Sequence, residues 1–242
     1  MPVFNPMHVH TGTNACIHSG TKMKIVEDMK IYLPCSRVNL VWQKLDKNAN
    51  TILDLGCGKG LPMIGINKHK ELFSIGTDLC LPRIKECLRR KVHDGYVLCD
   101  VRFLPFKKKT FNVVLCLEVI EHLLKNEFFS LKYEIEKIAT CQIIVSTPVG
   151  FFPISEHMDS PDDHKSGWIP VEFEKWGYKI RGINGLRCLH NTILKWSPFS
   201  KSRILRYILS YWSSFFVYFL PIFAHCMLCV KEIKAHACAY PQ

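Results

Sequence analysis

A short segment from Asp54 to Gly60 combines one acid with glycines at 56, 58 and 60. It follows an apolar run at 51–55 and precedes Pro62, which can occupy the first turn of a helix. Glycines in such a turn let the backbone approach a ligand closely, and free N–H groups at the start of the next helix attract an anion. The segment therefore predicts a binding turn for a ligand that carries a carboxylate.

Two more acids follow apolar runs that the pattern predicts as strands. Asp78 ends the run 73–77, about twenty residues after the glycine turn, where its carboxylate can accept hydrogen bonds from both hydroxyls of a ribose. Asp100 follows the run 96–99, where it can accept from an adenine amino group while the N–H of Val101 donates to the ring. The glycine turn and the two acids, each at a strand end, predict a site for an adenosine-containing cofactor.

A third group consists of Glu118, Glu121 and His122, directly after the apolar run 111–117. Because the spacings are three and four residues, a helical turn would bring the carboxylates and the imidazole onto one face. The group could hold a divalent cation such as Mg²⁺ or Mn²⁺ that ionises a substrate hydroxyl. Without metal, the catalytic candidates are Glu118 and His122, with His122 as general base. A purely structural role is the remaining interpretation.

The elements that must position these residues alternate along the chain. Helices are predicted over 33–45, from Pro82 onward, and over 128–139. Alternating strands and helices predict an α/β fold with a doubly wound, mostly parallel sheet. The predicted strands are 51–55, 73–77, 96–99, 111–117, 142–146, where Thr147 and Pro148 end the strand, 178–183 and 225–233.

At these residues the sequence resembles the class I S-adenosylmethionine-dependent methyltransferases. The resemblance is to the broad group with a D-x-G-x-G-x-G first motif and an L-P-F segment after the third strand, here Leu104 to Phe106, and it covers about residues 50–183 plus the last strand. It implies a Rossmann-like sheet and S-adenosylmethionine as cofactor. By this resemblance, the methionine end is held by Asp54, Gly56, Gly58 and Gly60, the ribose by Asp78 with Leu79 next to it, the adenine by Asp100 and Val101, and Glu118 lines the pocket.

A second, local resemblance concerns the E-x-x-E-H pattern. The ubiquinone-pathway O-methyltransferases and the small-RNA 3′-terminal 2′-O-methyltransferases both carry it at this place, and the second family adds a later histidine before an aromatic residue and a helix. Here His164 precedes Trp168. The resemblance implies a metal site of Glu118, Glu121, His122 and His164. Many other members of the broad group carry E-V-x-E-H without a metal, which leaves the alternatives open.

Size and composition restrict the domain organisation and the location. The chain has 242 residues, of which 48% are hydrophobic and 22% charged, which suits one core with additions. We expect an N-terminal arm at 1–32 and one methyltransferase domain over 33–242. The twelve scattered cysteines and the absence of an apolar leader predict a cytoplasmic protein. The net charge of +11 suits RNA, anionic lipid and acidic small molecules alike.

An insertion at 184–224 separates the last two predicted strands and is long enough to require structure of its own. Residues 207–230, which overlap it, contain no Asp, Glu, Lys or Arg. By length they could just span a bilayer, but Pro221 divides them into a helix-like and a strand-like half, and the sheet needs the second half. We expect an apolar helix packed as a lid or core element, with peripheral membrane contact through 203–224 as the alternative.

The sequence therefore predicts methyl transfer to a small-molecule or lipid-like hydroxyl or amine. One alternative is a metal-assisted RNA 2′-O-methyltransferase, which is less favoured because no RNA-recognition motif or zinc finger accompanies the basic clusters. Another is a non-catalytic protein on the same sheet, either a cofactor-binding subunit or a membrane-associated interaction protein.

Overall fold

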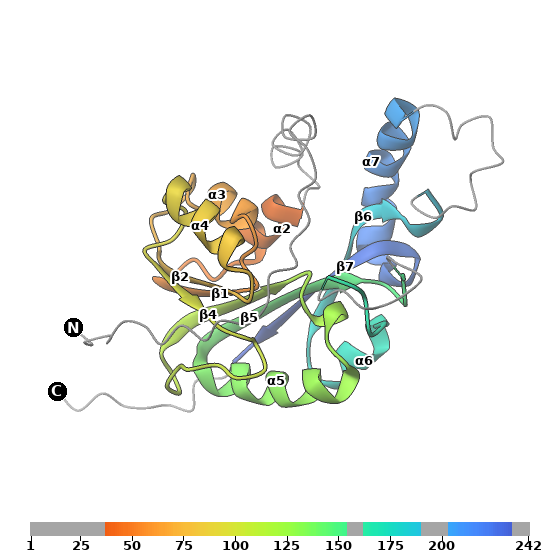
Figure 1. Cartoon of the computed structure of the whole chain (residues 1–242). Helices are drawn as coiled ribbons and strands as arrows, with labels where there is room; N and C mark the ends of the chain where they lie inside the picture. Colours follow the sequence, from red (N-terminus) through yellow and green to blue (C-terminus); the bar gives the residue numbers. More distant parts are fainter. Residues whose placement is uncertain (1–36, 154–161, 190–202, 234–242) are drawn as a thin grey trace.

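The computed structural model describes residues 37–153, 162–189 and 203–233 (Figure 1). The arm predicted at 1–32 lies outside these residues. The helices are α2 Arg37–Lys44, α3 Leu61–Ile66, α4 Leu81–Arg90, α5 Lys125–Ile138, α6 Pro170–Lys175 and α7 Arg203–Phe219. The strands are β1 Thr51–Leu55, β2 Phe73–Asp78, β3 Gly95–Leu98, β4 Phe111–Leu117, β5 Ala139–Pro148, β6 Lys179–Leu186 and β7 Ala224–Glu232. Short 3₁₀ turns are η2 Ile120–His122, η3 Arg187–Leu189 and η6 Pro221–Phe223.

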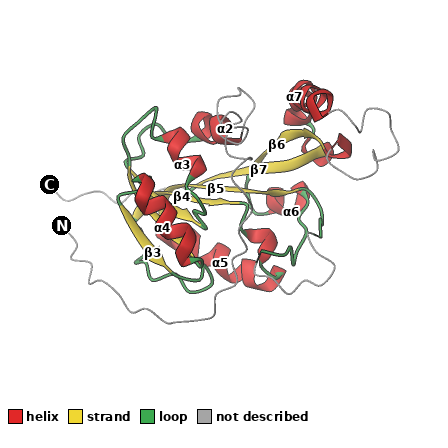
Figure 2. Ribbon diagram, turned by 45° about the horizontal axis from the view of Figure 1, so that its top comes forward, coloured by secondary structure: helices red, strands yellow, loops and turns green. Residues whose placement is uncertain are grey.

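The strands form one sheet in the order β3-β2-β1-β4-β5-β7-β6. All neighbouring pairs are parallel except those that involve β7, which runs antiparallel to β5 and β6. Helices α2, α3 and α4 lie on one face of the sheet, and α5 and α6 lie on the other (Figures 1 and 2). This confirms the predicted Rossmann-like, mostly parallel α/β fold.

The register of the central strands brings three carboxyl ends together. Leu55 at the end of β1 lies beside Thr77 of β2 on one side and Cys116 of β4 on the other. The strand order reverses between β1 and β4, since the chain moves outward through β2 and β3 before it returns. A ligand crevice is expected at such a reversal. The glycine turn, Asp78 and the segment after β4 all lie there.

Successive side chains of a central strand point to opposite faces of the sheet, so each strand contributes to the core on both faces. Ile52 packs with α2 and α3 in one buried cluster, whereas Leu53 and Leu55 belong to a second cluster with Phe128 of α5. β4 divides its side chains between the two clusters in the same way. Strands covered on both faces are apolar at consecutive positions, which explains the unbroken runs seen in the sequence.

Two predicted boundaries in this region were wrong. The helix predicted to Ala139 ends at Ile138, and Ala139 begins β5. The strand predicted to end before Thr147 continues through Pro148, because Thr147 and Pro148 pair with Met227 and Cys226 of β7. The long antiparallel partner extends β5 beyond the end of β4, which the local sequence does not encode.

The predicted helical insertion before the last strand is confirmed by α7, but its predicted start at 184 was wrong, because β6 continues to Leu186. This helix packs on β6 through small residues: a Cβ built on Gly182 would lie 2.0 Å from the carbonyl oxygen of Val217. Ser210 Oγ donates to the carbonyl of Asn184, and Ser213 Oγ accepts from the N–H of Leu186, both at 3.0 Å. Within the described residues, no helix has the length and hydropathy needed to cross a bilayer.

We predict that Gly182→Ala lowers the free energy of unfolding by about 1–3 kcal/mol, because the added methyl group overlaps the backbone of α7. The measurement is the urea unfolding midpoint at constant slope. Gly177→Ala is the control, since a Cβ there meets nothing within 4 Å and adds only the strain of a positive φ. A Gly182→Ala loss no larger than that of the control would contradict the close approach.

Candidate active site

The glycine turn after β1 has a backbone that requires glycine. Gly56, Gly58 and Gly60 have φ values of +63°, +54° and +74°, in the left-handed region that side chains disfavour. A Cβ on Gly56 would also lie 2.4 Å from a methyl carbon of Val119, which follows β4. The turn therefore passes closely under the segment that carries the Glu118 to His122 group.

Asp78 lies against this turn, and its ribose role stays a prediction. One carboxylate oxygen accepts from the N–H of Gly58 at 2.9 Å, and the other accepts from the N–H of Cys80 at 2.8 Å. Burial raises the pKa of Asp78, although these N–H groups oppose the rise. The next residue, Leu79, is 59% exposed, so an apolar side chain is available beside the acid.

Asp54 has a different immediate partner. Its Oδ2 lies 3.0 Å from Nε2 of His93, and both side chains are buried. The sequence analysis missed His93, which follows α4 and belongs to no recognisable motif. The first residue of the glycine motif therefore contacts the segment that precedes β3. A direct contact of Asp54 with the cofactor stays a prediction.

Asp100 and Val101 follow β3, where the adenine contacts were predicted. Arg102 holds the Asp100 carboxylate with its Nε at 3.0 Å from both oxygens, and it also donates to Glu127 at 2.8 Å. Burial acts to raise the pKa of Asp100, but the hydrogen bonds from Arg102 outweigh it and the pKa lies below its ordinary value. An ionised, oriented acid is therefore available there as a hydrogen-bond acceptor.

Glu118 does not share a helical turn with Glu121 and His122, so that part of the spacing argument was wrong. Glu118 has a φ of +56°, and the 3₁₀ turn η2 begins only at Ile120. Its carboxylate instead lies 3.0 Å from Nη1 of Arg37 and accepts from Oγ of Ser146 at 2.9 Å. Arg37 comes from α2 and was also missed, because nothing in a helix sequence indicates a partner this far along the chain.

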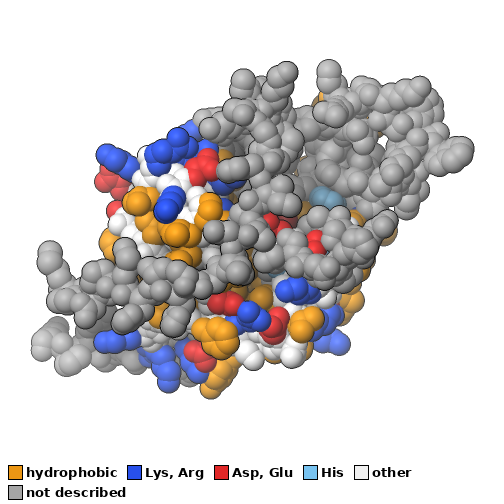
Figure 3. Space-filling view, in the orientation of Figure 1, with side chains coloured by type: hydrophobic (Ala, Val, Ile, Leu, Met, Phe, Trp, Pro, Cys, Tyr) orange, Lys and Arg blue, Asp and Glu red, His pale blue; other side chains and the backbone are white. Residues whose placement is uncertain are grey.

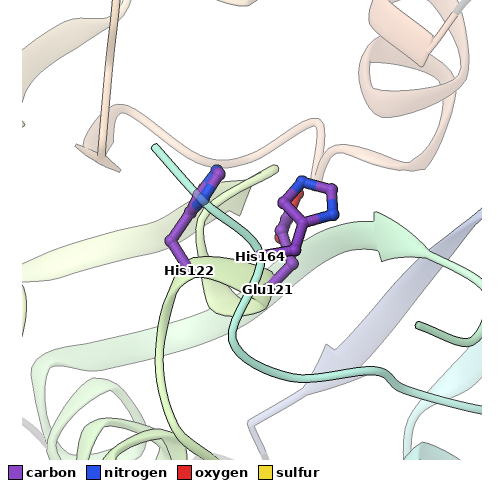
Figure 4. Close-up of side chains that lie close together, drawn as sticks. All are labelled: Glu121, His122 and His164. Carbon is purple, nitrogen blue, oxygen red and sulfur yellow. The ribbon is translucent and has the colours of Figure 1, made fainter. Parts of the chain in front are cut away.

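Glu121, His122 and His164 converge (Figure 4). Each offers one ligand atom, and these atoms lie within 4.8 Å of one another. Two backbone N–H groups, those of Lys165 and Ser166, donate to the carbonyl of Glu121 at 2.7 and 3.1 Å and hold the later segment against η2. The structure therefore brings together three of the four predicted ligands, with Glu118 outside the group.

The electrostatics of this cluster suit a cation. Burial, with Glu118 nearby, raises the pKa of Glu121 well above its ordinary value, even though Thr147 donates to it at 3.2 Å. Burial and the neighbouring His122 lower the pKa of His164, which favours the neutral imidazole, the form that coordinates a metal. His122 Nδ1 lies 3.2 Å from the carbonyl oxygen of Asp163, an orienting contact of the kind that metal-binding histidines use.

This donor set fits a divalent ion. Two imidazoles and one carboxylate are common ligands of first-row divalent metals, and a three-residue set leaves positions for substrate oxygen. A positive ion would also favour the ionised form of the buried Glu121 carboxylate, whose charge burial disfavours.

Comparison with known proteins agrees with this architecture. Residues 53–138 match the family described as "Methyltransferase domain". An uncharacterized protein of Methanocaldococcus jannaschii is 28% identical over 195 residues, which are 78% of this chain and 80% of that protein. The sequence similarity to this relative therefore covers much more of the chain than the cofactor motifs do.

Solved structures share the fold. A chain in the complex between the Haloferax volcanii Trm112 methyltransferase activator and the putative methyltransferase has a TM-score of 0.59, at 14% identity, over 90% of this chain and 98% of its own. A SAM-dependent methyltransferase from Archaeoglobus fulgidus has a TM-score of 0.53, at 19% identity, over 86% of this chain and 99% of its own. The family match over residues 53–138, together with the fold shared with SAM-dependent methyltransferases, supports the assignment of the chain as an S-adenosylmethionine-dependent methyltransferase.

Proposed function

We propose that the chain methylates a hydroxyl oxygen, and that Glu121, His122 and His164 hold a divalent cation such as Mg²⁺ or Mn²⁺ beside that oxygen. The observation that carries the proposal is the convergence of these three side chains within 4.8 Å at the end of β4. That position adjoins the glycine turn, where the cofactor motif lies. Cofactor and cation sites would therefore share one crevice.

The reaction needs alignment more than a strong base. S-adenosylmethionine supplies a methyl group already activated by its sulfonium. The O–CH₃ bond forms as the S–CH₃ bond breaks, and the hydroxyl proton leaves to solvent. A bound divalent cation would lower the pKa of the hydroxyl and so raise the fraction of nucleophilic oxygen. The part of this chain is to hold the acceptor in line with the methyl group.

The acceptor that suits the surroundings is a small molecule with an apolar body. Phe151 and Ile169, on either side of the His164 segment, are exposed by 43% and 41%. In the uncovered parts of the face shown in Figure 3, Lys and Arg side chains lie next to Asp and Glu side chains. A polyanion such as RNA is held mainly by basic contacts to its phosphates, which a surface of mixed charge supplies less well.

The cofactor assignment predicts that Asp78→Ala weakens S-adenosylmethionine binding by roughly 1.5–3 kcal/mol, because a charged acceptor for the ribose is lost. Calorimetric titration measures the affinity. Asp94→Ala is the matched control, since Asp94, like Asp78, accepts from a backbone N–H, that of Ser74 at 2.7 Å, but lies at the amino end of β2. Unchanged affinity in Asp78→Ala would refute the ribose role.

The metal assignment predicts that chelation with EDTA stops methyl transfer while calorimetric S-adenosylmethionine binding persists. His164→Ala should weaken Mn²⁺ binding, followed by electron paramagnetic resonance, by at least about tenfold, because one of three ligands is lost. His69→Ala is the control, since His69 is an exposed histidine stacked on Trp42 at 4.8 Å between ring centroids.

If EDTA leaves turnover unchanged while His122→Ala lowers it, the metal is excluded and His122 acts alone in the acceptor pocket. If neither treatment changes turnover, the cluster is structural.

The acceptor class can be tested with radiolabelled cofactor and fractionated cell extract. Label in small, organic-extractable molecules that is stable to alkali indicates a methyl ether and so a hydroxyl acceptor. Alkali-labile label released as methanol indicates a methyl ester, and label on a basic nitrogen indicates an amine. Label that ribonuclease converts to nucleotides would replace the small molecule with RNA.

A further inference from the structure

Helix α7 has an inverted arrangement of side chains. Its inner face, toward β6, consists of Ser210, Ser213, Ser214 and Val217, and the three hydroxyls all form hydrogen bonds within the protein. The small inner residues allow the contact with Gly182 of β6 described above. An ordinary surface helix buries its large apolar side chains and exposes its small polar ones. This helix does the opposite.

The outer face of α7 is a stripe of aromatic side chains. Trp212, Phe215, Phe216 and Phe219, at spacings of three, four and seven residues, are exposed by 74%, 75%, 53% and 64%. The chain continues the apolar surface beyond the helix through Ile222 and Phe223, exposed by 52% and 54%. A contiguous exposed patch of this kind on a soluble fold marks a binding surface.

The charge of the region indicates what this surface binds. Strand β6, η3 and α7 together contain five Lys or Arg residues and no Asp or Glu. A second copy of the chain would bring two acid-free, basic regions together, which like-charge repulsion disfavours. An anionic bilayer surface complements the charge, and Trp, Tyr and Phe are the side chains that settle at the headgroup level of a membrane.

We propose that α7 docks the enzyme peripherally on anionic membranes, with Trp212, Phe215, Phe216 and Phe219 entering the interface while Ser210 and Ser213 stay bound to β6. The helix lies on the surface and does not cross the bilayer. Docking is independent of the metal cluster, so it holds or fails separately from the proposed hydroxyl methylation.

Flotation of the full chain with vesicles tests the proposal. The wild type should float with phosphatidylcholine and phosphatidylglycerol mixed at about two to one, less with pure phosphatidylcholine, and less again at high salt. The double variant Phe215→Ser, Phe219→Ser should lose roughly tenfold or more of its partition coefficient, because two aromatic side chains no longer enter the interface. The matched control is Phe73→Ser, Tyr133→Ser, which removes two aromatics of 52% and 62% exposure from other surfaces and should float as the wild type does.

A second measurement needs no destabilising change. Vesicles with brominated acyl chains should quench the tryptophan fluorescence of the wild type, and much of that quenching should disappear in Trp212→Phe. Unchanged S-adenosylmethionine affinity shows that each variant is folded.

Three results would overturn the proposal: no flotation of the wild type with anionic vesicles, equal flotation of the Phe215, Phe219 variant and the wild type, or quenching that Trp212→Phe does not reduce. A wild-type dimer that ignores vesicles and dissociates in the double variant would assign the face to a second copy. Capture of a protein partner without vesicle binding would likewise replace the membrane.

Discussion

The parallel pairing of β1 with both β2 and β4 is the constraint on which the site depends. Leu55 has Thr77 on one side and Cys116 on the other, so three loops leave the sheet at the same level. The glycine turn then contacts Asp78 and Val119 at once. A slip of register would separate the turn from both neighbours, because each of these contacts joins segments that are distant in sequence.

The acidic-histidine cluster depends on a second, smaller set of contacts. The backbone of the segment at 163–166 is bonded to η2 through the Glu121 carbonyl, and the hydroxyl of Ser166 donates to the carbonyl of Ile120 at 3.1 Å. These bonds bring His164 beside His122, with ring centroids 5.0 Å apart. Burial then gives the cluster its chemistry, since it disfavours the ionised Glu121 carboxylate and the charged His164 imidazole. The same side chains in water would have neither property.

The two ends of the sheet serve different purposes. The half from β3 to β4 carries the cofactor motif, and its loops are built from glycines and acids. The half with β6 and β7 carries α7, whose serine face satisfies its polar groups against β6 and thereby leaves the aromatic face outward. The proposed membrane docking uses this division, with the cofactor motif in one half of the sheet and α7 on the other.

The sequence by itself determined the class of fold and the cofactor motif, because both depend on residues that are close together in the chain. The strand-turn-helix alternation, the glycines of the turn and the acids at 78 and 100 each follow from neighbouring residues, and the structure places the strands where the apolar runs predict them. The helix-to-strand change at Pro221 was readable for the same reason. Tertiary structure alone decided the rest. The pairing of Asp54 with His93 and of Glu118 with Arg37, the extension of β5 along β7, and the outward turn of the aromatic stripe all arise from contacts between segments far apart in the chain. Helical periodicity locates a stripe of side chains but does not say which stripe meets the protein, since that depends on the surface against which the helix packs.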